Sequence, residues 1–124
     1  MKLLKCAGCG KMVTVLTDSA CPTKCCGEPM EEMIAGTSDG AAEKHVPQVT
    51  VDGNTVTVDV GEVAHPMLDA HFIEWALIET KEGAQYKALQ PGDAPKLTFK
   101  LTDGDTLTDV YAYCNLHGLW KAQL

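Results

Sequence analysis

The sequence predicts a mainly β protein, with a small metal-bound N-terminal domain followed by a larger antiparallel β-sandwich. Five of the six cysteines lie within the first 26 residues, which marks that segment as a separate metal-binding domain. Beyond residue 40, short stretches rich in β-branched residues alternate with turn residues, as in a sandwich of short strands. No stretch has the period of a long amphipathic helix.

The length and charge of the chain limit its architecture and its partners. A chain of 124 residues allows one domain of ordinary size, or a small domain joined to a very small one. The net charge of -7 argues against a nucleic-acid partner, because phosphate binding needs a basic surface. An anionic substrate would need a local positive patch to offset the overall repulsion.

The apolar segments of the chain predict a location. No apolar run approaches the roughly 20 residues of a membrane span. The residues before Cys6 contain no apolar stretch of signal-peptide length. We therefore expect a soluble, cytoplasmic protein. In that reducing compartment, cysteines serve more often as metal ligands or redox groups than as disulfides.

Residues 1–36 form the expected N-terminal domain, and residues 37–124 form the second. The first has few large apolar side chains, and domains of about 40 residues or fewer usually need disulfides, metal or oligomerisation. The small polar segment 36–44, GTSDGAAEK, is expected to serve as the linker.

The second domain begins with a predicted hairpin, followed by a third strand. Residues 48–61, QVTVDGNTVTVDVG, alternate valine with threonine or aspartate around an Asp-Gly-Asn turn, which predicts a hairpin. Residues 71–80, HFIEWALIET, are rich in aromatic and branched side chains and predict a further strand.

Two further segments follow. Residues 86–95, YKALQPGDAP, contain two prolines and a glycine and predict a loop. Residues 96–114 predict a second hairpin-like pair around Asp103-Gly104-Asp105. In its first half, Leu97, Phe99 and Leu101 should face one side.

The cysteines of the first domain are candidate ligands for one metal ion. Cys6 and Cys9 form a CxxC knuckle, and four thiolates would make a tetrahedral site for zinc or iron. The second pair is either Cys25 with Cys26 or Cys21 with Cys25, and spacing does not decide between them. Adjacent side chains normally point to opposite sides, so a vicinal pair would distort the site and weakly favour redox iron over structural zinc.

A second group of candidate ligands lies beyond residue 40 and combines histidines with one cysteine. Imidazoles suit zinc, copper and iron, and a thiolate adds strong electron donation. Five protein ligands exceed the tetrahedral shell of zinc and fit an iron with one open position. The residues are His45, His65, His71, Cys114 and His117.

Two non-catalytic functions compete with an iron enzyme. Cysteine and histidines on a β-sandwich also suit a blue copper electron-transfer protein with a His2Cys site, but here two more histidines need an explanation. The other alternative is a zinc-binding or iron-storage module. Metal analysis separates the three, as two irons per chain, one copper, or zinc only.

Motifs along essentially the whole chain resemble the desulfoferrodoxin class of superoxide reductases. The matching segments, in the family's order and approximate spacing, are KCAGCG, CCGEPM, EKHVP, VAHPM, HFIEW and YCNLHGLWKA. The resemblance implies a desulforedoxin-like or rubredoxin-like N-terminal domain and an immunoglobulin-like β-sandwich, each with one iron. The first iron, which zinc can replace, would be bound by Cys6, Cys9, Cys25 and Cys26. The additional Cys21 departs from the pattern and would be a free thiol.

The resemblance also implies the reaction, a one-electron reduction of superoxide to hydrogen peroxide in oxidative stress defence. The second iron would have four equatorial histidines and the axial thiolate of Cys114, which pushes electron density toward the open position. Lys44 would attract superoxide, and Glu43 would be the mobile carboxylate that fills that position after oxidation. Family members are typically homodimers that receive electrons from a small protein such as rubredoxin. The equatorial ligands would be His45, His65, His71 and His117.

Overall fold

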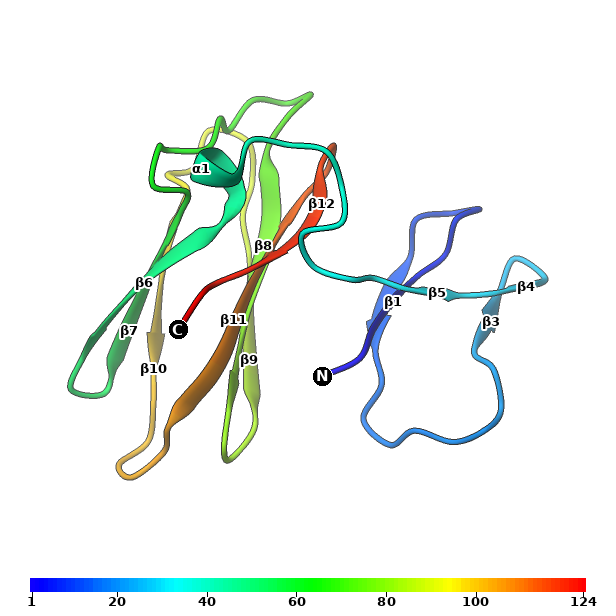
Figure 1. The fold of residues 1–124 in the computed structure, drawn as a ribbon, viewed down its shortest axis with the longest axis horizontal. Helices are drawn as coiled ribbons and strands as arrows, with labels where there is room; N and C mark the ends of the chain where they lie inside the picture. The colour runs from blue at the N-terminus through cyan, green and yellow to red at the C-terminus, as the bar shows by residue number, and fades with distance from the viewer. The chain divides into compact units, whose positions relative to one another are not determined.

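The computed structural model describes residues 1–124, which form two compact units, Met1–Ile34 and Ala35–Leu124. Both units are built mainly of β-strands (Figure 1). The one α-helix, α1, spans only Ala42–His45, and the chain contains no helix with the length and apolar character of a membrane span.

The first unit contains five short strands in two antiparallel sheets. One sheet has the order β2-β1-β5, and β3 pairs with β4 in the other. Leu3, Leu4 and Cys6 are its only buried hydrophobic residues, so this unit depends on more than a core for its stability. The strands are β1 (Leu3–Lys5), β2 (Met12–Thr14), β3 (Lys24–Cys25), β4 (Glu28–Pro29) and β5 (Glu31–Glu32).

The second unit is a sandwich of two antiparallel sheets, with strand orders β10-β7-β6 and β12-β11-β8-β9. Valines of β7 and phenylalanine of β10 on one sheet share a single core with β8 and β11 on the other. The fold is therefore mainly β, as predicted. The strands are β6 (Pro47–Asp52), β7 (Thr55–Val60), β8 (Ile73–Thr80), β9 (Ala84–Ala88), β10 (Lys96–Lys100), β11 (Leu107–Cys114) and β12 (Gly118–Lys121).

The first predicted hairpin is confirmed. Strands β6 and β7 pair from Pro47↔Val60 to Asp52↔Thr55, and Gly53, with a φ of 58°, forms the two-residue turn with Asn54. The alternation in β10 is confirmed as well, because Leu97, Phe99 and Leu101 are buried whereas Thr98 and Lys100 are exposed.

The second predicted hairpin is wrong. Strand β10 pairs with β7, whereas β11 pairs with β8 and β12, so the turn at Asp103-Gly104-Asp105 joins strands of different sheets. The alternation around a turn identifies two strands with one buried face each, but it does not decide whether they pair or face one another across the core.

The predicted loop 86–95 is also partly wrong. Its first three residues belong to β9, which pairs with β8 from Trp75↔Ala88 to Glu79↔Ala84. This edge strand is mostly exposed, so it lacks the apolar alternation that marks a half-buried strand.

Candidate metal centres

Three connecting segments of the second unit bring the predicted histidine-cysteine group together. His45 ends α1, and His65 and His71 lie in the segment between β7 and β8. Cys114 ends β11, and His117 lies in the turn before β12. One ligand atom from each of the five residues lies within 4.8 Å of all the others.

Backbone carbonyls set the orientation of two imidazoles. The Nδ1 atom of His45 is 2.7 Å from the carbonyl oxygen of Ala41, and that of His65 is 2.7 Å from the oxygen of Pro66. Because a carbonyl only accepts, each Nδ1 donates its proton. Both Nε2 atoms therefore carry lone pairs in the neutral rings, and they face each other at 3.0 Å.

A metal cation fits this arrangement. Burial lowers the pKa of His45, and it lowers the pKa of His65 to about 4, so protonation does not relieve the opposed lone pairs at neutral pH. The buried Nε2 of His71 has no hydrogen-bond partner, which is costly unless a ligand satisfies it. Neutral imidazoles held by a carbonyl at the second nitrogen are typical of metal ligation.

The remaining two donors come from the end of β11 and from the turn that follows it. His117 presents Nδ1, which lies 3.1 Å from Nε2 of His45 and 3.8 Å from the Cys114 sulfur. Burial raises the pKa of Cys114, while the backbone N–H groups of His117 and Leu116 act in the opposite direction. A metal cation beside this sulfur would favour the thiolate.

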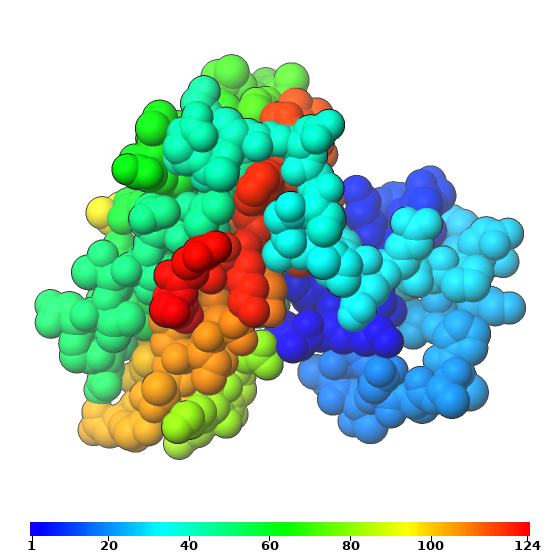
Figure 2. Space-filling view, viewed as in Figure 1, coloured from blue at the N-terminus to red at the C-terminus, as the bar shows by residue number.

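The segment expected only as a linker lies against His117 and Trp120. A Cβ on Gly40 would be 3.1 Å from Trp120 Cζ2 and 3.2 Å from the Cβ of His117. The N–H of Gly36 donates to the Leu119 carbonyl at 2.9 Å. In Figure 2 this cyan segment lies against the orange and red atoms of the C-terminal residues. Sequence reasoning missed this role, although the run of small residues allows the close approach.

Glu43 and Lys44 lie beside the group, on the same short helix as His45. Both side chains are exposed, and the Glu43 carbonyl accepts from the N–H of Val63 at 2.7 Å. Lys44 adds to the causes that lower the pKa of His45 and His71, behind burial and the neighbouring imidazoles. The helix thus carries one positive charge close to the candidate centre.

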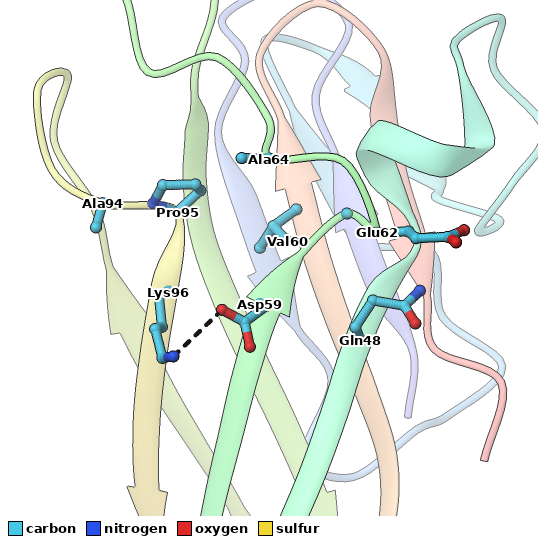
Figure 3. Close-up of a pocket in the computed structure, with 9 residues that line it drawn as sticks. Gln48, Asp59, Val60, Glu62, Ala64, Ala94, Pro95 and Lys96 are labelled. Carbon is cyan, nitrogen blue, oxygen red and sulfur yellow. Dashed lines mark ion pairs between the residues drawn. The ribbon is translucent and has the colours of Figure 1, made fainter.

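A cavity of about 500 Å³ lies beyond the segment that follows β7, and it contains none of the candidate ligands. Asp59 and Lys96 on its wall form an ion pair at 3.6 Å (Figure 3). Both side chains are largely exposed, so the cavity is a solvent-filled groove outside the candidate centre.

The second group, in the first unit, contains the sulfurs of four cysteines. Their Sγ atoms lie within 4.8 Å of one another in the set Cys6, Cys9, Cys25 and Cys26. Cys26 has a φ of 54° and is the one non-glycine residue with positive φ. Adjacent side chains normally point to opposite sides of the backbone. The left-handed conformation of Cys26 instead turns the side chains of Cys25 and Cys26 toward one point.

The thiols of this group do not ionise alike. The backbone N–H groups of Cys9 and Gly8 lower the pKa of Cys6 to about 6. Hydrogen bonding with Cys9 and then Cys6 raises the pKa of Cys25 to about 12. One thiolate is therefore favoured without metal, and a cation is needed to hold all four. Cys21 is exposed and lies outside the group.

Comparisons with known proteins match both units. The family model described as Desulfoferrodoxin matches residues 37–123. A desulfoferrodoxin of Nitratidesulfovibrio vulgaris is 46% identical over 98% of this chain and 95% of its own length. A desulfoferrodoxin homolog of Archaeoglobus fulgidus is 42% identical over 98% of this chain and 96% of its own length.

Solved structures give a consistent result. The superoxide reductase of Treponema pallidum is 36% identical, with a TM-score of 0.83 over 99% of this chain and 100% of that one. The one-iron superoxide reductase of Giardia intestinalis is 33% identical, with a TM-score of 0.54 over 64% of this chain and 94% of that one.

Proposed function

The chain belongs to the desulfoferrodoxin family, and on that premise we propose that it is a superoxide reductase. Superoxide gains one electron and two protons and leaves as hydrogen peroxide. The observation that carries this proposal is the group of four imidazole nitrogens and one cysteine sulfur within 4.8 Å. This donor set differs from the His2Cys set of a blue copper protein, which disfavours the non-catalytic alternative.

We assign the ligands of the catalytic iron to the five residues of this group. Iron bound there would supply the electron that reduces superoxide. The residues are His45, His65, His71, Cys114 and His117.

The surrounding protein keeps three of the imidazole donors in the neutral state that metal binding requires. Burial lowers the pKa values of His45, His65 and His71, so the rings remain neutral and present lone pairs. Burial raises the pKa of the Cys114 thiol, and the peptide N–H groups of His117 and Leu116 only partly offset this, so a bound metal cation would be needed to hold the thiolate. That thiolate would donate electron density and so assist the release of peroxide.

Lys44 and Glu43 are assigned roles toward the substrate and the product. The exposed ammonium of Lys44 draws the superoxide anion to an otherwise acidic protein and donates a hydrogen bond to it. Glu43, one residue earlier on α1, would be the carboxylate that takes the place of the product after oxidation. The protons come from solvent.

We propose that residues 1–36 form an iron-binding domain and residues 37–124 the catalytic domain. The ligands of the first iron are the four grouped cysteines, with zinc as the alternative metal. The left-handed Cys26 and the low pKa of Cys6 support this assignment. Those ligands are Cys6, Cys9, Cys25 and Cys26.

The partners and location are proposed from the same premise. A small electron-transport protein such as rubredoxin would re-reduce the iron bound at the histidine group, and the chain would form a homodimer. Six cysteines with no disulfide among them suit a reducing compartment, the cytoplasm. Sedimentation of the iron-loaded protein tests the dimer, and anaerobic reduction by rubredoxin tests the donor.

Anaerobic purification with metal counting, followed by reaction of the reduced protein with superoxide, tests the proposed function. The proposal predicts iron at the histidine site, iron or zinc at the cysteine site, and a yield of peroxide without oxygen. Oxygen at half the amount of superoxide would indicate a dismutase instead. One copper per chain, or zinc alone, would favour a non-catalytic protein.

A further inference from the structure

We propose that Asn115 is a positioning residue that holds the loop bearing His71 against the turn bearing Cys114 and His117. The inference rests on the proposed function, since it takes all three neighbours as ligands of one metal ion. Asn115 itself contacts no reacting atom in this proposal.

The amide of Asn115 bonds the loop on both sides of His71. Its Oδ1 accepts from the N–H of Phe72 at 2.9 Å, and its Nδ2 donates to the carbonyl of Ala70 at 3.1 Å. Its own backbone N–H donates to the Phe72 carbonyl at 3.2 Å. One residue thus makes three hydrogen bonds to the two neighbours of a single histidine.

His71 needs such support more than the other histidines of its loop and helix do. The rings of His45 and His65 are each held by a backbone carbonyl at Nδ1. No backbone carbonyl holds the ring of His71 in this way, and its buried Nε2 atom has no hydrogen-bond partner. Its backbone forms an isolated bridge with Leu68. The position of the His71 ring therefore depends on the backbone of residues 70–72. Asn115 fixes that backbone through its three hydrogen bonds.

The amide also acts where regular strand pairing ends. Strands β8 and β11 pair in register from Glu79↔Asp109 to Trp75↔Tyr113, and the register then shifts before Ile73↔Cys114. Such an irregularity disrupts the backbone hydrogen bonds between the two strands. It does so at Cys114, whose sulfur must point toward the candidate metal centre. The side chain of Asn115 replaces the interrupted ladder with two bonds of its own.

An amide is the side chain that this place requires. A carboxylate would accept from Phe72 but has no proton to donate to the Ala70 carbonyl. It would also place a negative charge beside Cys114, whose sulfur is 4.0 Å from Oδ1. Asn115 is only half-buried, so water can replace its hydrogen bonds when the side chain is removed. Its loss should therefore disturb the orientation of His71 more than the folding of the protein.

Iron release from the intact two-iron protein tests the inference. Asn115→Ala, Asn54→Ala and the unaltered chain are mixed with excess ferrous chelator, and loss of the histidine-bound iron is followed by its own absorption. Asn54 is the matched control, because its amide also joins two distant loops, through Asp103, in the hairpin between β6 and β7. Iron of the cysteine site serves as an internal reference.

We expect Asn115→Ala to lose the histidine-bound iron roughly 10- to 100-fold faster, as loss of a group that orients a ligand does. Its thiolate-to-iron absorption band should also shift. Asn54→Ala should match the unaltered chain, and the cysteine site should be unchanged in all three. Release at the unaltered rate with an unshifted band in Asn115→Ala would overturn the inference, as would equal acceleration in Asn54→Ala.

Asn115→Asp decides the question if Asn115→Ala does not fold. It keeps the acceptor for Phe72 and loses the donor to Ala70, while its added charge alone would retain a cation longer. Faster release supports the inference, and equal or slower release overturns it. An unaltered chain without metal at the histidine group would instead overturn both the proposed function and the inference.

Discussion

The Nε2 atoms of His45 and His65 face each other at 3.0 Å while the Nδ1 atom of each ring donates to a backbone carbonyl. Both rings are nearly fully buried, and burial lowers both pKa values, so a bridging proton is disfavoured at neutral pH. Two opposed lone pairs at this distance are stable only with a cation close to both. The protein holds this arrangement through its own hydrogen bonds, and metal binding completes it.

Cys114→Ser should abolish the thiolate-to-iron charge-transfer colour of the oxidised protein, because a serine oxygen is a far poorer electron donor than a thiolate. Visible absorption of the purified, oxidised variant measures this. Cys21→Ser is the control, since Cys21 is exposed and lies outside both groups. Unchanged colour in Cys114→Ser would remove Cys114 from the ligand set.

Lys44→Ala should slow the reaction with superoxide by roughly three- to tenfold at low salt, because electrostatic attraction of the anion is lost. The dependence of the rate on ionic strength should also flatten. Pulse-radiolysis rates over a salt series measure both effects. Lys81→Ala makes the same change in net charge in the turn after β8, and it should keep the original salt slope. Equal slopes in the two variants would exclude a local role for Lys44.

Cys26→Ser should lose the metal of the first unit, because three sulfurs and a hydroxyl hold iron or zinc poorly. Cys21→Ser should keep it. Metal counting of each purified variant against its protein concentration tests the choice between the two cysteine pairs. Retained metal in Cys26→Ser together with lost metal in Cys21→Ser would reverse our assignment.

Gly61→Ala should destabilise the protein by roughly 3 kcal/mol or more, through backbone strain combined with a steric clash. Gly61 has a φ of +89°, and an added Cβ would lie 2.4 Å from the Val63 oxygen and 2.5 Å from the Lys44 oxygen. Gly53→Ala is the control: its φ is +58° with nothing within 4 Å, so only the left-handed strain of about 1 kcal/mol applies.

Urea unfolding of the iron-loaded variants gives the two free energies of unfolding. Equal losses of unfolding free energy in the two variants would mean that the close approach of the Lys44 carbonyl to Gly61 does not matter for stability. A larger loss in Gly61→Ala would show that this glycine is required for the segment after β7 to lie against α1.

Asp105→Asn should lower stability at neutral pH and flatten its decline in acid. The Thr80 hydroxyl, followed by the N–H groups of Thr106 and Glu82, lowers the pKa of Asp105 in the folded state. A carboxylate with a depressed folded pKa contributes stability above its unfolded pKa of about 3.9. That contribution disappears as pH falls through the folded value.

Thermal melting from pH 7 to pH 2 measures the effect of Asp105. The difference in Tm between Asp105→Asn and the unaltered chain should shrink as the pH falls below about 4. Asp52→Asn, at the end of β6, is the charge-matched control. A constant difference in Tm over the whole range would show that the Asp105 charge does not contribute.

Much of the candidate catalytic group was predictable, because its chemistry is carried by rare residue types. Five candidate ligands were identified by type and motif, and the structure gathers all five. The choice of Cys25 with Cys26 depended on a resemblance, since spacing alone was ambiguous. The left-handed φ of Cys26 supplies the physical reason that adjacent cysteines can share one point, and no local sequence rule required it.

The strand pairing was less predictable, because alternation reports which face of a strand is buried and not what covers it. Residues 96–114 have two strands around a turn, but the strands lie in opposite sheets. Residues 36–41 have no apolar pattern, so nothing in them indicated that Gly40 lies against His117 and Trp120. Contacts of this kind depend on segments that are far apart in the chain.

By itself, the sequence determined the two-part organisation, the β class and the set of candidate ligands, because composition, turn residues and motif spacing are local properties. Only the tertiary structure decided which nitrogen each histidine presents, how Cys26 turns toward its neighbours and that Asn115 links the His71 loop to Cys114. These features follow from packing distant segments together, where a few hydrogen bonds select one ring direction among several that the chain alone allows.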